Sequence, residues 1–103
     1  MRKTAVLAAL AGLSPWAMAD NTDLGKEVFT QTAQPSCTIC HALADAGSSG
    51  AIGPDLDELK PTRDQIVNAV LGGVGVMPAF EDSLSSEQIQ ALADYILSVT
   101  SDQ

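Results

Sequence analysis

Apolar residues recur at helical spacing in three stretches of the chain, and these stretches predict its main elements. Residues three and four positions apart share one face of a helix, so each stretch is expected to bury one face against the others. The first of these helices is predicted from Asp23 to about Thr32. The apolar positions are Leu24, Val28 and Phe29 in the first stretch, Ile66, Val67, Val70 and Leu71 in the second, and Ile89, Leu92, Ala93 and Ile96 in the third.

The two later helices carry recognisable start signals. Thr62 is followed three residues later by Gln65, a pattern that fits a capping box, in which the two side chains satisfy free backbone N–H groups at the helix N-terminus. Ser85 and Gln88 repeat the pattern. Gly72 suits the position just after the end of the second helix. The two helices are therefore predicted to begin next to Thr62 and Ser85.

Strand signals are almost absent, and the segments between the helices are long. Connections of that length in a small domain suggest that they wrap around something. The predicted fold class is therefore all-α, with three to four short helices, long loops and no sheet. A domain of this size buries a limited core and usually needs a metal, disulfides or another staple, and a large apolar cofactor at its centre would supply the missing core.

Residues 1–19 have the layout of a secretory signal peptide. A short positive start is followed by an apolar run over residues 5–13 and by a small-x-small cleavage site at Ala17-Met18-Ala19. The run is too short to serve comfortably as a membrane anchor, because about 20 apolar residues are needed to span a bilayer. Cleavage would leave residues 20–103 as one domain without a membrane span, located outside the cytoplasm.

The charge of the chain is strongly acidic. It contains 5 Lys and Arg residues against 13 Asp and Glu residues, for a formal net charge of −8. Removal of the predicted signal peptide takes away Arg2 and Lys3 and makes the remainder more acidic still. Nucleic acid is excluded as a partner of such a surface. The acidity either steers a partner with a basic patch or serves solubility alone.

The most specific motif is Cys37-Thr38-Ile39-Cys40-His41, a C-x-x-C-H sequence that is typical of c-type haem attachment. Two thiols three positions apart on a turn can each form a thioether with a vinyl group of haem, and the next residue places an imidazole under the iron. The motif therefore predicts one covalent haem c, bound through Cys37 and Cys40, with His41 as a ligand of the iron.

Three other uses of the motif are weighed against haem. A thioredoxin-like dithiol also uses C-x-x-C, but its fold needs strands that alternate with helices. A structural disulfide is possible, although a bridge between cysteines this close in sequence stabilises little. Zinc would need four ligands, and Cys37, Cys40 and His41 supply three.

Met77 is the candidate for the second iron ligand. Of the three methionines, Met1 and Met18 belong to the predicted signal peptide. Met77 lies in a glycine-rich segment in which the backbone can bend sharply, and Pro78 stiffens the next position. His/Met ligation raises haem potential, and an iron with six ligands has no open site for a substrate, which favours electron transfer. The alternative is that Met77 fills the core.

Gly53-Pro54-Asp55-Leu56 is predicted to support the first ligand. A ligating histidine usually donates its second ring N–H to a carbonyl or carboxylate, which fixes the orientation of the ring. The carbonyl of Pro54 is the candidate acceptor for His41. The alternative is an ordinary turn.

The chain resembles the class I cytochromes c, especially the small bacterial periplasmic monohaem proteins, over nearly all of residues 20–103. The resemblance implies that the first and last helices cross closely at Gly25, with Tyr95 packed over the crossing. It also implies the order of the ligands, with the haem motif near the N-terminus and the methionine downstream. The matching positions are Gly25, Phe29, Cys37 to His41, Gly53 to Leu56, Met77 to Phe80, Leu92 and Tyr95.

Two departures from this family stand out. The only Trp lies in the predicted signal peptide, so the tryptophan that often bonds a haem propionate is missing. Lys60, Arg63 or a backbone N–H are the candidates to replace it. The lysine ring with which mitochondrial members dock is also missing, so their partners do not carry over.

The predicted function is that of a periplasmic one-electron carrier, either a free shuttle or the haem subunit of a periplasmic dehydrogenase, and not an enzyme by itself. The expected partners are redox proteins with a basic docking surface: a dehydrogenase as donor, and an oxidase or another cytochrome as acceptor. Electrons would pass through an apolar patch at the haem edge, for which Ile52, Val76, Ala79 and Phe80 are the candidates. The alternatives are a peroxidase-like haem enzyme in which Met77 is displaced, and a thiol–disulfide protein without haem.

Overall fold

The structure is a computed structural model that describes residues 21–101. The signal peptide predicted at residues 1–19 lies outside the described residues. Between residues 21 and 101 no helix has the length and apolar character needed to cross a bilayer.

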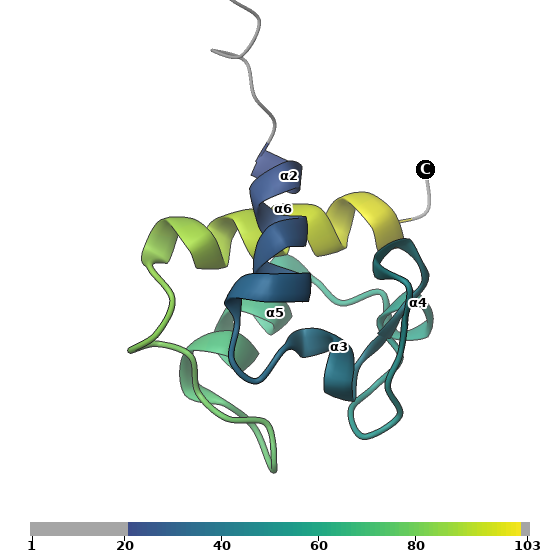
Figure 1. Ribbon diagram of the computed structural model, residues 1–103, viewed down its shortest axis with the longest axis horizontal. Helices are drawn as coiled ribbons and strands as arrows, with labels where there is room; N and C mark the ends of the chain where they lie inside the picture. Colours follow the sequence, from purple (N-terminus) through teal and green to yellow (C-terminus); the bar gives the residue numbers. More distant parts are fainter. Residues whose placement is uncertain (1–20, 102–103) are drawn as a thin grey trace, which may run out of the picture.

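Helices dominate the described part of the chain, which confirms the predicted all-α class (Figure 1). Two single-turn helices were not expected from the pattern. One, α3, carries the cysteine motif, and the other, α4, follows the Gly-Pro segment. In chain order the elements are α2 (Asn21–Glu27), the π-helical turn η2 (Val28–Thr32), α3 (Cys37–Cys40), β1 (Ala42–Leu43), the 3₁₀ turn η3 (Ala44–Ala46), β2 (Ser48–Ser49), α4 (Leu56–Leu59), α5 (Arg63–Gly72) and α6 (Ser86–Thr100).

The expectation of no sheet is wrong in one detail. Strands β1 and β2 form a very short antiparallel hairpin, in which Ala42 pairs with Ser49 and Leu43 with Ser48. Gly47 allows the chain to turn back, because its φ of 69° lies in the left-handed region. Two residues per strand are too few to leave an alternating pattern in the sequence.

The first and last helices cross at close range, as the family resemblance implied (Figure 1). Gly25 lies at the crossing, where a Cβ atom would be 2.0 Å from the carbonyl oxygen of Ala91 and 2.5 Å from Cβ of Tyr95. Just beyond, the rings of Phe29 and Tyr95 meet edge to face, with centroids 6.1 Å apart. The missing side chain at Gly25 therefore sets the distance between the two helices.

The core lies between this crossed pair and the segments below it. In α6 every position of the predicted apolar stripe is buried, and so is Leu84, which lies just before the helix. In α5 the stripe is buried at Ile66 and Val70 and half-buried at its other two positions. The cluster also includes Val28, Phe29, Ala33, Leu43, Leu56, Phe80 and Tyr95.

Both predicted capping boxes are present. The N–H of Gln65 donates to Oγ1 of Thr62 at 3.2 Å, and the N–H of Thr62 donates to Oε1 of Gln65 at 2.8 Å. Ser85 and Gln88 form the same pair of bonds at the start of α6. At the other end of α5 the prediction is one residue short, because Gly72 is still helical and Gly73 follows it with a φ of 74°.

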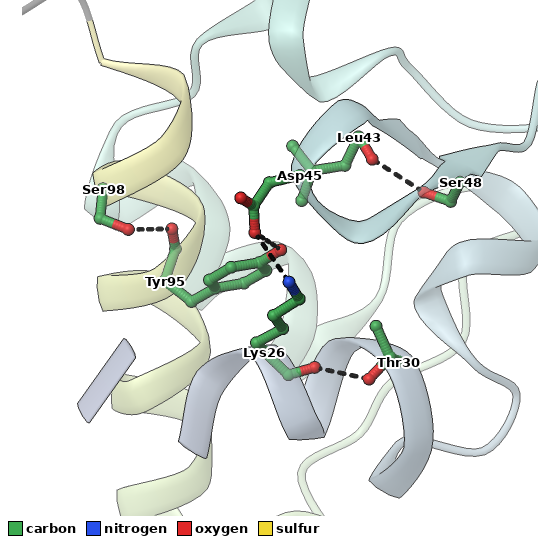
Figure 2. A network of polar contacts seen from close by, with 7 residues as sticks. All are labelled: Lys26, Thr30, Leu43, Asp45, Ser48, Tyr95 and Ser98. Carbon is green, nitrogen blue, oxygen red and sulfur yellow. Dashed lines mark hydrogen bonds and ion pairs between the residues drawn. The ribbon is translucent and has the colours of Figure 1, made fainter. Parts of the chain in front are cut away.

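A small polar network ties the turn η3 to both crossed helices (Figure 2). The hydroxyl of Tyr95 donates to Oδ2 of Asp45 at 2.6 Å, and Nζ of Lys26 lies 3.4 Å from the same oxygen. The hydrogen bond from Tyr95 holds the pKa of Asp45 below its ordinary value, with a smaller contribution from Lys26. Burial of the ring, together with the Asp45 carboxylate, raises the pKa of Tyr95.

Candidate functional site

A cavity of about 730 Å³ lies below the crossed helices. That volume falls within the range of about 300 to 1,000 Å³ that is typical of ligand and cofactor sites. Every predicted site residue lines this one cavity, although the residues come from three separate segments of the chain: Cys37, Cys40, His41, Pro54 and Met77.

The short helix α3 places the two cysteines. Ser36 caps the helix, because its Oγ accepts the N–H of Thr38 at 3.3 Å. Positions 37 and 40 are one helical turn apart, so both sulfur atoms face the cavity. Both thiols are free in the structure. Burial raises the pKa of the Cys37 thiol to about 11, which keeps it protonated at neutral pH.

His41 follows α3 in extended conformation, and its backbone N–H still donates to the carbonyl of Cys37 at 3.0 Å. Its ring nitrogen Nδ1 lies 2.7 Å from the carbonyl oxygen of Pro54. A carbonyl oxygen can only accept, so Nδ1 carries the proton. The lone pair of the neutral ring is then on Nε2, which is the atom available to a metal ion.

Gly53 makes room for this imidazole. A Cβ atom on Gly53 would lie 2.6 Å from Cε1 of His41 and within 3.1 Å of both ring nitrogens. The N–H of Gly53 also donates to the carbonyl of Cys40 at 2.7 Å, which ties the loop to the cysteine motif. The hydrogen bond to Pro54 and the close backbone of Gly53 therefore fix the orientation of the ring without a contribution from a cofactor.

Met77 reaches the cavity from a tight hairpin. The N–H of Val74 donates to the carbonyl of Met77 at 3.1 Å, and the N–H of Met77 donates back at 2.9 Å. Gly75 is the first of the two residues between Val74 and Met77 in this hairpin. Its φ of 57° is positive, as the first central residue of a type II′ turn requires. Gly73 allows the close approach of the returning chain, since a Cβ there would meet the carbonyl oxygen of Met77 at 2.6 Å. The half-buried side chain of Met77 packs against the core.

The structure argues against the other uses of the cysteine motif. A thiol used in disulfide exchange needs a lowered pKa, whereas the pKa of Cys37 is raised. No three His, Cys, Asp or Glu side chains converge on a possible metal-ion site anywhere in residues 21–101. The strands β1 and β2 are also too short to form the sheet of a thioredoxin-like domain.

The four residues expected to surround an exposed cofactor edge differ in exposure and in position relative to the cavity. Ile52 and Val76 line the cavity with 66% and 86% of their surfaces exposed. Ala79 is exposed but does not line it. Phe80 also lines the cavity but was placed wrongly at the exposed rim, because it is buried in the core, where its N–H donates to the carbonyl of Val70 at 2.8 Å.

The cations proposed for a cofactor carboxylate are not on the cavity wall. Arg63 binds Asp94 and the side-chain oxygen of Gln90, both on α6. Lys60 does not line the cavity either. The polar side chains that do line it from α5 are Gln65 and Asn68. Sequence reasoning missed these two, although their spacing of three places them on one side of the helix.

The residues of the cavity fit a covalent haem. Its walls are mostly apolar, as a porphyrin requires, and two thiols, an imidazole nitrogen and a thioether open onto the same space. The glycine next to the imidazole leaves space that a side chain would fill. Cys37 and Cys40 would hold the ring, and His41 and Met77 are the residues able to donate to its iron.

Comparison with known proteins agrees with this fit. The family model described as "Cytochrome C oxidase, cbb3-type, subunit III" matches residues 20–96. In sequence the chain is similar to cytochrome c6 of Porphyra purpurea, with 34% identity over 103 residues that cover 92% of this chain and 86% of the relative. It is also similar to cytochrome c-551 of Halorhodospira halochloris, with 25% identity over 75 residues that cover 72% of this chain and 95% of the relative.

A solved structure shares the fold. The crystal structure of the c-type cytochrome SorU from Sinorhizobium meliloti superimposes with a TM-score of 0.74 at 45% sequence identity. The match covers 78% of this chain and 91% of that chain. The sequence and structural comparisons therefore point to the same kind of protein.

Proposed function

The chain belongs to the class I c-type cytochromes, with one haem c bound through Cys37 and Cys40, and from that premise we propose a periplasmic one-electron carrier with His41 and Met77 as axial ligands of the iron. The electron-carrier role is that of the family. The ligand pair, the cellular location and the partners are the proposal.

One observation carries the ligand assignment. His41, whose Nδ1 is engaged by the carbonyl of Pro54, and Met77 line the same cavity as the two cysteines. His41 is the only histidine of the chain, and Met77 is the only methionine beyond position 18. A neutral nitrogen and a neutral thioether would favour ferrous over ferric iron, and with both donors in place the iron would have no open site for a substrate.

Haem supplies an iron that takes up and releases one electron, and the protein contributes a rigid surrounding. Pro54 holds the imidazole through a hydrogen bond of 2.7 Å. The hairpin with its two reciprocal backbone bonds holds Met77. Fixed ligands lower the reorganisation that accompanies each change of oxidation state. Ile52 and Val76 at the mouth of the cavity provide an apolar contact through which a partner can approach.

The proposed partners are redox proteins with basic docking surfaces. Among the described basic residues, Lys26 is paired with Asp45 and Arg63 with Asp94, so little unbalanced positive charge remains against the many exposed carboxylates. Such a field steers basic proteins towards the molecule. The chain would act as a free shuttle or as the haem subunit of a dehydrogenase, and copurification from native extracts separates the two.

Replacement of Met77 tests the ligand pair. Met77→Ala is expected to leave haem attached, to lower the midpoint potential and to open the sixth position, so that the ferrous protein binds carbon monoxide. Val76→Ala, on the same hairpin but exposed, is the matched control and is expected to keep the wild-type spectrum. A wild-type spectrum and potential in Met77→Ala would refute the assignment. Carbon monoxide binding by the wild type at neutral pH would instead favour the peroxidase-like alternative.

Replacement of Cys40 tests the attachment. Cys40→Ser removes one of the two thiols that face the cavity, so the yield of covalent holoprotein is expected to fall severely. The measurement is haem staining of the denatured protein against total protein. Normal attachment in this variant would contradict a thioether at Cys40.

A further inference from the structure

The haem of a c-type cytochrome carries two carboxylates, the propionates, and we propose that the side-chain amides of Gln65 and Asn68 on α5 hold this acidic edge. The inference rests on the proposed function only in requiring a haem tethered through Cys37 and Cys40. It does not depend on which residue is the sixth ligand.

The cavity separates the helix that carries the cysteines from the helix that carries the amides. Both α3 and α5 line the cavity, and the two are not among the elements of the described chain that pack closely on each other. The two vinyl groups of haem lie on one edge of the porphyrin, and the two propionates lie on the opposite edge. Tethering of the vinyl edge to α3 would therefore direct the propionates away from α3, and α5 is one of the walls that line the cavity away from α3.

No cationic side chain lines the cavity within residues 21–101. Arg63 is held by Asp94 and Gln90, and Lys26 lies beside Asp45. Nζ of Lys60 donates to the carbonyl of Asp57 at 3.3 Å. A carboxylate that leaves bulk water needs hydrogen-bond donors. With the basic side chains engaged elsewhere, the side-chain candidates to supply them are neutral donors on the cavity wall.

The capping box of α5 prepares the amide of Gln65 for this role. Its Oε1 accepts the N–H of Thr62 at 2.8 Å, which fixes the oxygen on the side of the helix terminus. The remaining Nε2 group can only donate. Gln65 lines the cavity, so what it offers to a ligand there is an N–H donor and not a carbonyl.

Asn68 continues the same side of the helix. It lies one turn after Gln65, lines the cavity and is exposed to solvent. Within residues 21–101 no side-chain hydrogen bond of Asn68 to another residue is found, so its amide is available to a ligand. The neighbouring Ile66 is buried in the core. The two amides therefore lie on the part of the α5 wall that is open to solvent. A charged propionate edge is expected on that side, because carboxylates are best solvated there.

The one other polar side chain without charge on the wall is already occupied. Ser36 lies next to Cys37, and its Oγ contacts the carbonyl of Phe29 at 3.2 Å and Oγ1 of Thr38 at 2.8 Å. It also sits on the tethered side of the cavity. The structure therefore assigns the donor role to the pair on α5.

The test compares holoproteins that carry haem labelled with ¹³C at the propionate carboxyl carbons. Asn68→Ala removes one amide. Gln65→Glu keeps an oxygen for the capping box but removes the N–H donor. Gln31→Ala, an exposed amide that does not line the cavity, is the matched control. Both cavity variants are expected to shift the NMR resonance of at least one carboxyl carbon and to lower the midpoint potential, and the control is expected to change neither.

Unchanged carboxyl resonances in both Asn68→Ala and Gln65→Glu would overturn the proposal, and so would an equal shift in Gln31→Ala. Failure of the proposed function is seen separately. In that case the methyl resonance of Met77 in the ferrous wild type would lack the large shift that a ligand close to the porphyrin face experiences. The carboxyl comparison needs only covalently attached haem, so it remains interpretable in either case.

Discussion

At the scale of single residues, the site depends on groups that hold other groups in place. Pro54 contributes no side-chain chemistry, yet its carbonyl decides which nitrogen of His41 carries the proton. Gly53 contributes only the space that the imidazole occupies. Tyr95 fastens the turn η3 to the helix crossing through Asp45 (Figure 2). Each of these roles can be tested by removing a single group.

Gly53→Ala is expected to displace the imidazole, because its Cβ would lie 2.6 Å from the ring of His41. Weakened axial ligation should appear as a mixed-spin absorption spectrum of the ferric protein and as a lower midpoint potential. Gly72→Ala is the control, since no atom lies within 4 Å of the added Cβ. A variant Gly53→Ala with the wild-type spectrum would show that the ring does not depend on this space.

Tyr95→Phe removes a hydroxyl but keeps the edge-to-face contact with Phe29. The loss of stability at neutral pH is expected to be about 1 kcal/mol, below the full value for a bond to a charged group because the side chain of Asp45 is 43% exposed. Denaturant unfolding of both holoproteins measures it. No loss at neutral pH would mean that water replaces the bond at no cost.

The same pair of proteins should show a defined pH dependence. Folding lowers the pKa of the Asp45 carboxyl from 3.8. Its hydrogen bond with Tyr95 therefore stabilises the protein fully above pH 3.8, and this contribution is lost as the pH falls through the lower pKa of the folded state. Folding raises the pKa of the Tyr95 hydroxyl from 10.0. The contribution of the bond to stability is therefore complete below pH 10.0 and is lost at higher pH, as the pH rises towards the raised pKa of the folded state. The difference between wild type and Tyr95→Phe should therefore be constant near neutrality and shrink at both extremes. A difference that grows in acid would contradict the assigned bond.

At the scale of elements, the crossing of α2 and α6 organises the fold. It brings together the two ends of the described chain and forms the roof of the cavity with Phe29, Leu92 and Ile96. The two capping boxes set where α5 and α6 begin, and thereby fix which of their residues face the core. The helices are short, so their stability comes mainly from packing and not from helix propensity.

Gly25→Ala should separate the crossed helices, since the added Cβ would lie 2.0 Å from a backbone oxygen that cannot rotate away. Overpacking of a tight core costs about 1–3 kcal/mol of folding stability. The loss in Gly25→Ala is expected to be about 3 kcal/mol or more, because the added Cβ meets backbone atoms. Thermal unfolding of the holoprotein provides the measurement. Gly72→Ala, also helical but in open space, is expected to be neutral or slightly stabilising. Equal effects of the two substitutions would refute the importance of the crossing.

At the scale of the whole molecule, a small acidic domain surrounds an apolar cavity of about 730 Å³. Haem contributes the part of the core that the chain itself lacks. The chain carries a formal net charge of −8. Structure and charge together suit a protein that meets its partners briefly, with electrostatics guiding the encounter.

The association rate with a basic redox protein is expected to fall by about tenfold between low and physiological salt, because ions screen the attraction. Stopped-flow electron transfer at a series of salt concentrations measures this rate. An acidic redox protein as partner is the control and should show the opposite trend. Rates that are independent of salt for both partners would contradict steering by the surface charge.

Much of the fold followed from local patterns. The helical spacing of apolar residues and the capping pairs at Thr62 and Ser85 depend on interactions within a few residues, so the sequence was enough to predict α2, α5 and α6, but not the single-turn helices α3 and α4. The cysteine motif also predicted its cofactor, because thiol spacing is itself a local property. The hairpin β1–β2 escaped prediction because two residues per strand leave no pattern.

What only the tertiary structure decided is how distant segments meet. The proton on Nδ1 of His41 depends on the carbonyl of Pro54, which a separate loop brings within 2.7 Å. Phe80 is buried and Arg63 is turned towards α6, although nothing near them in sequence requires either. Gln65 and Asn68 became candidates only once a cavity wall was seen. Local preference sets the type of each element, whereas the positions of side chains around the cavity follow from packing between elements.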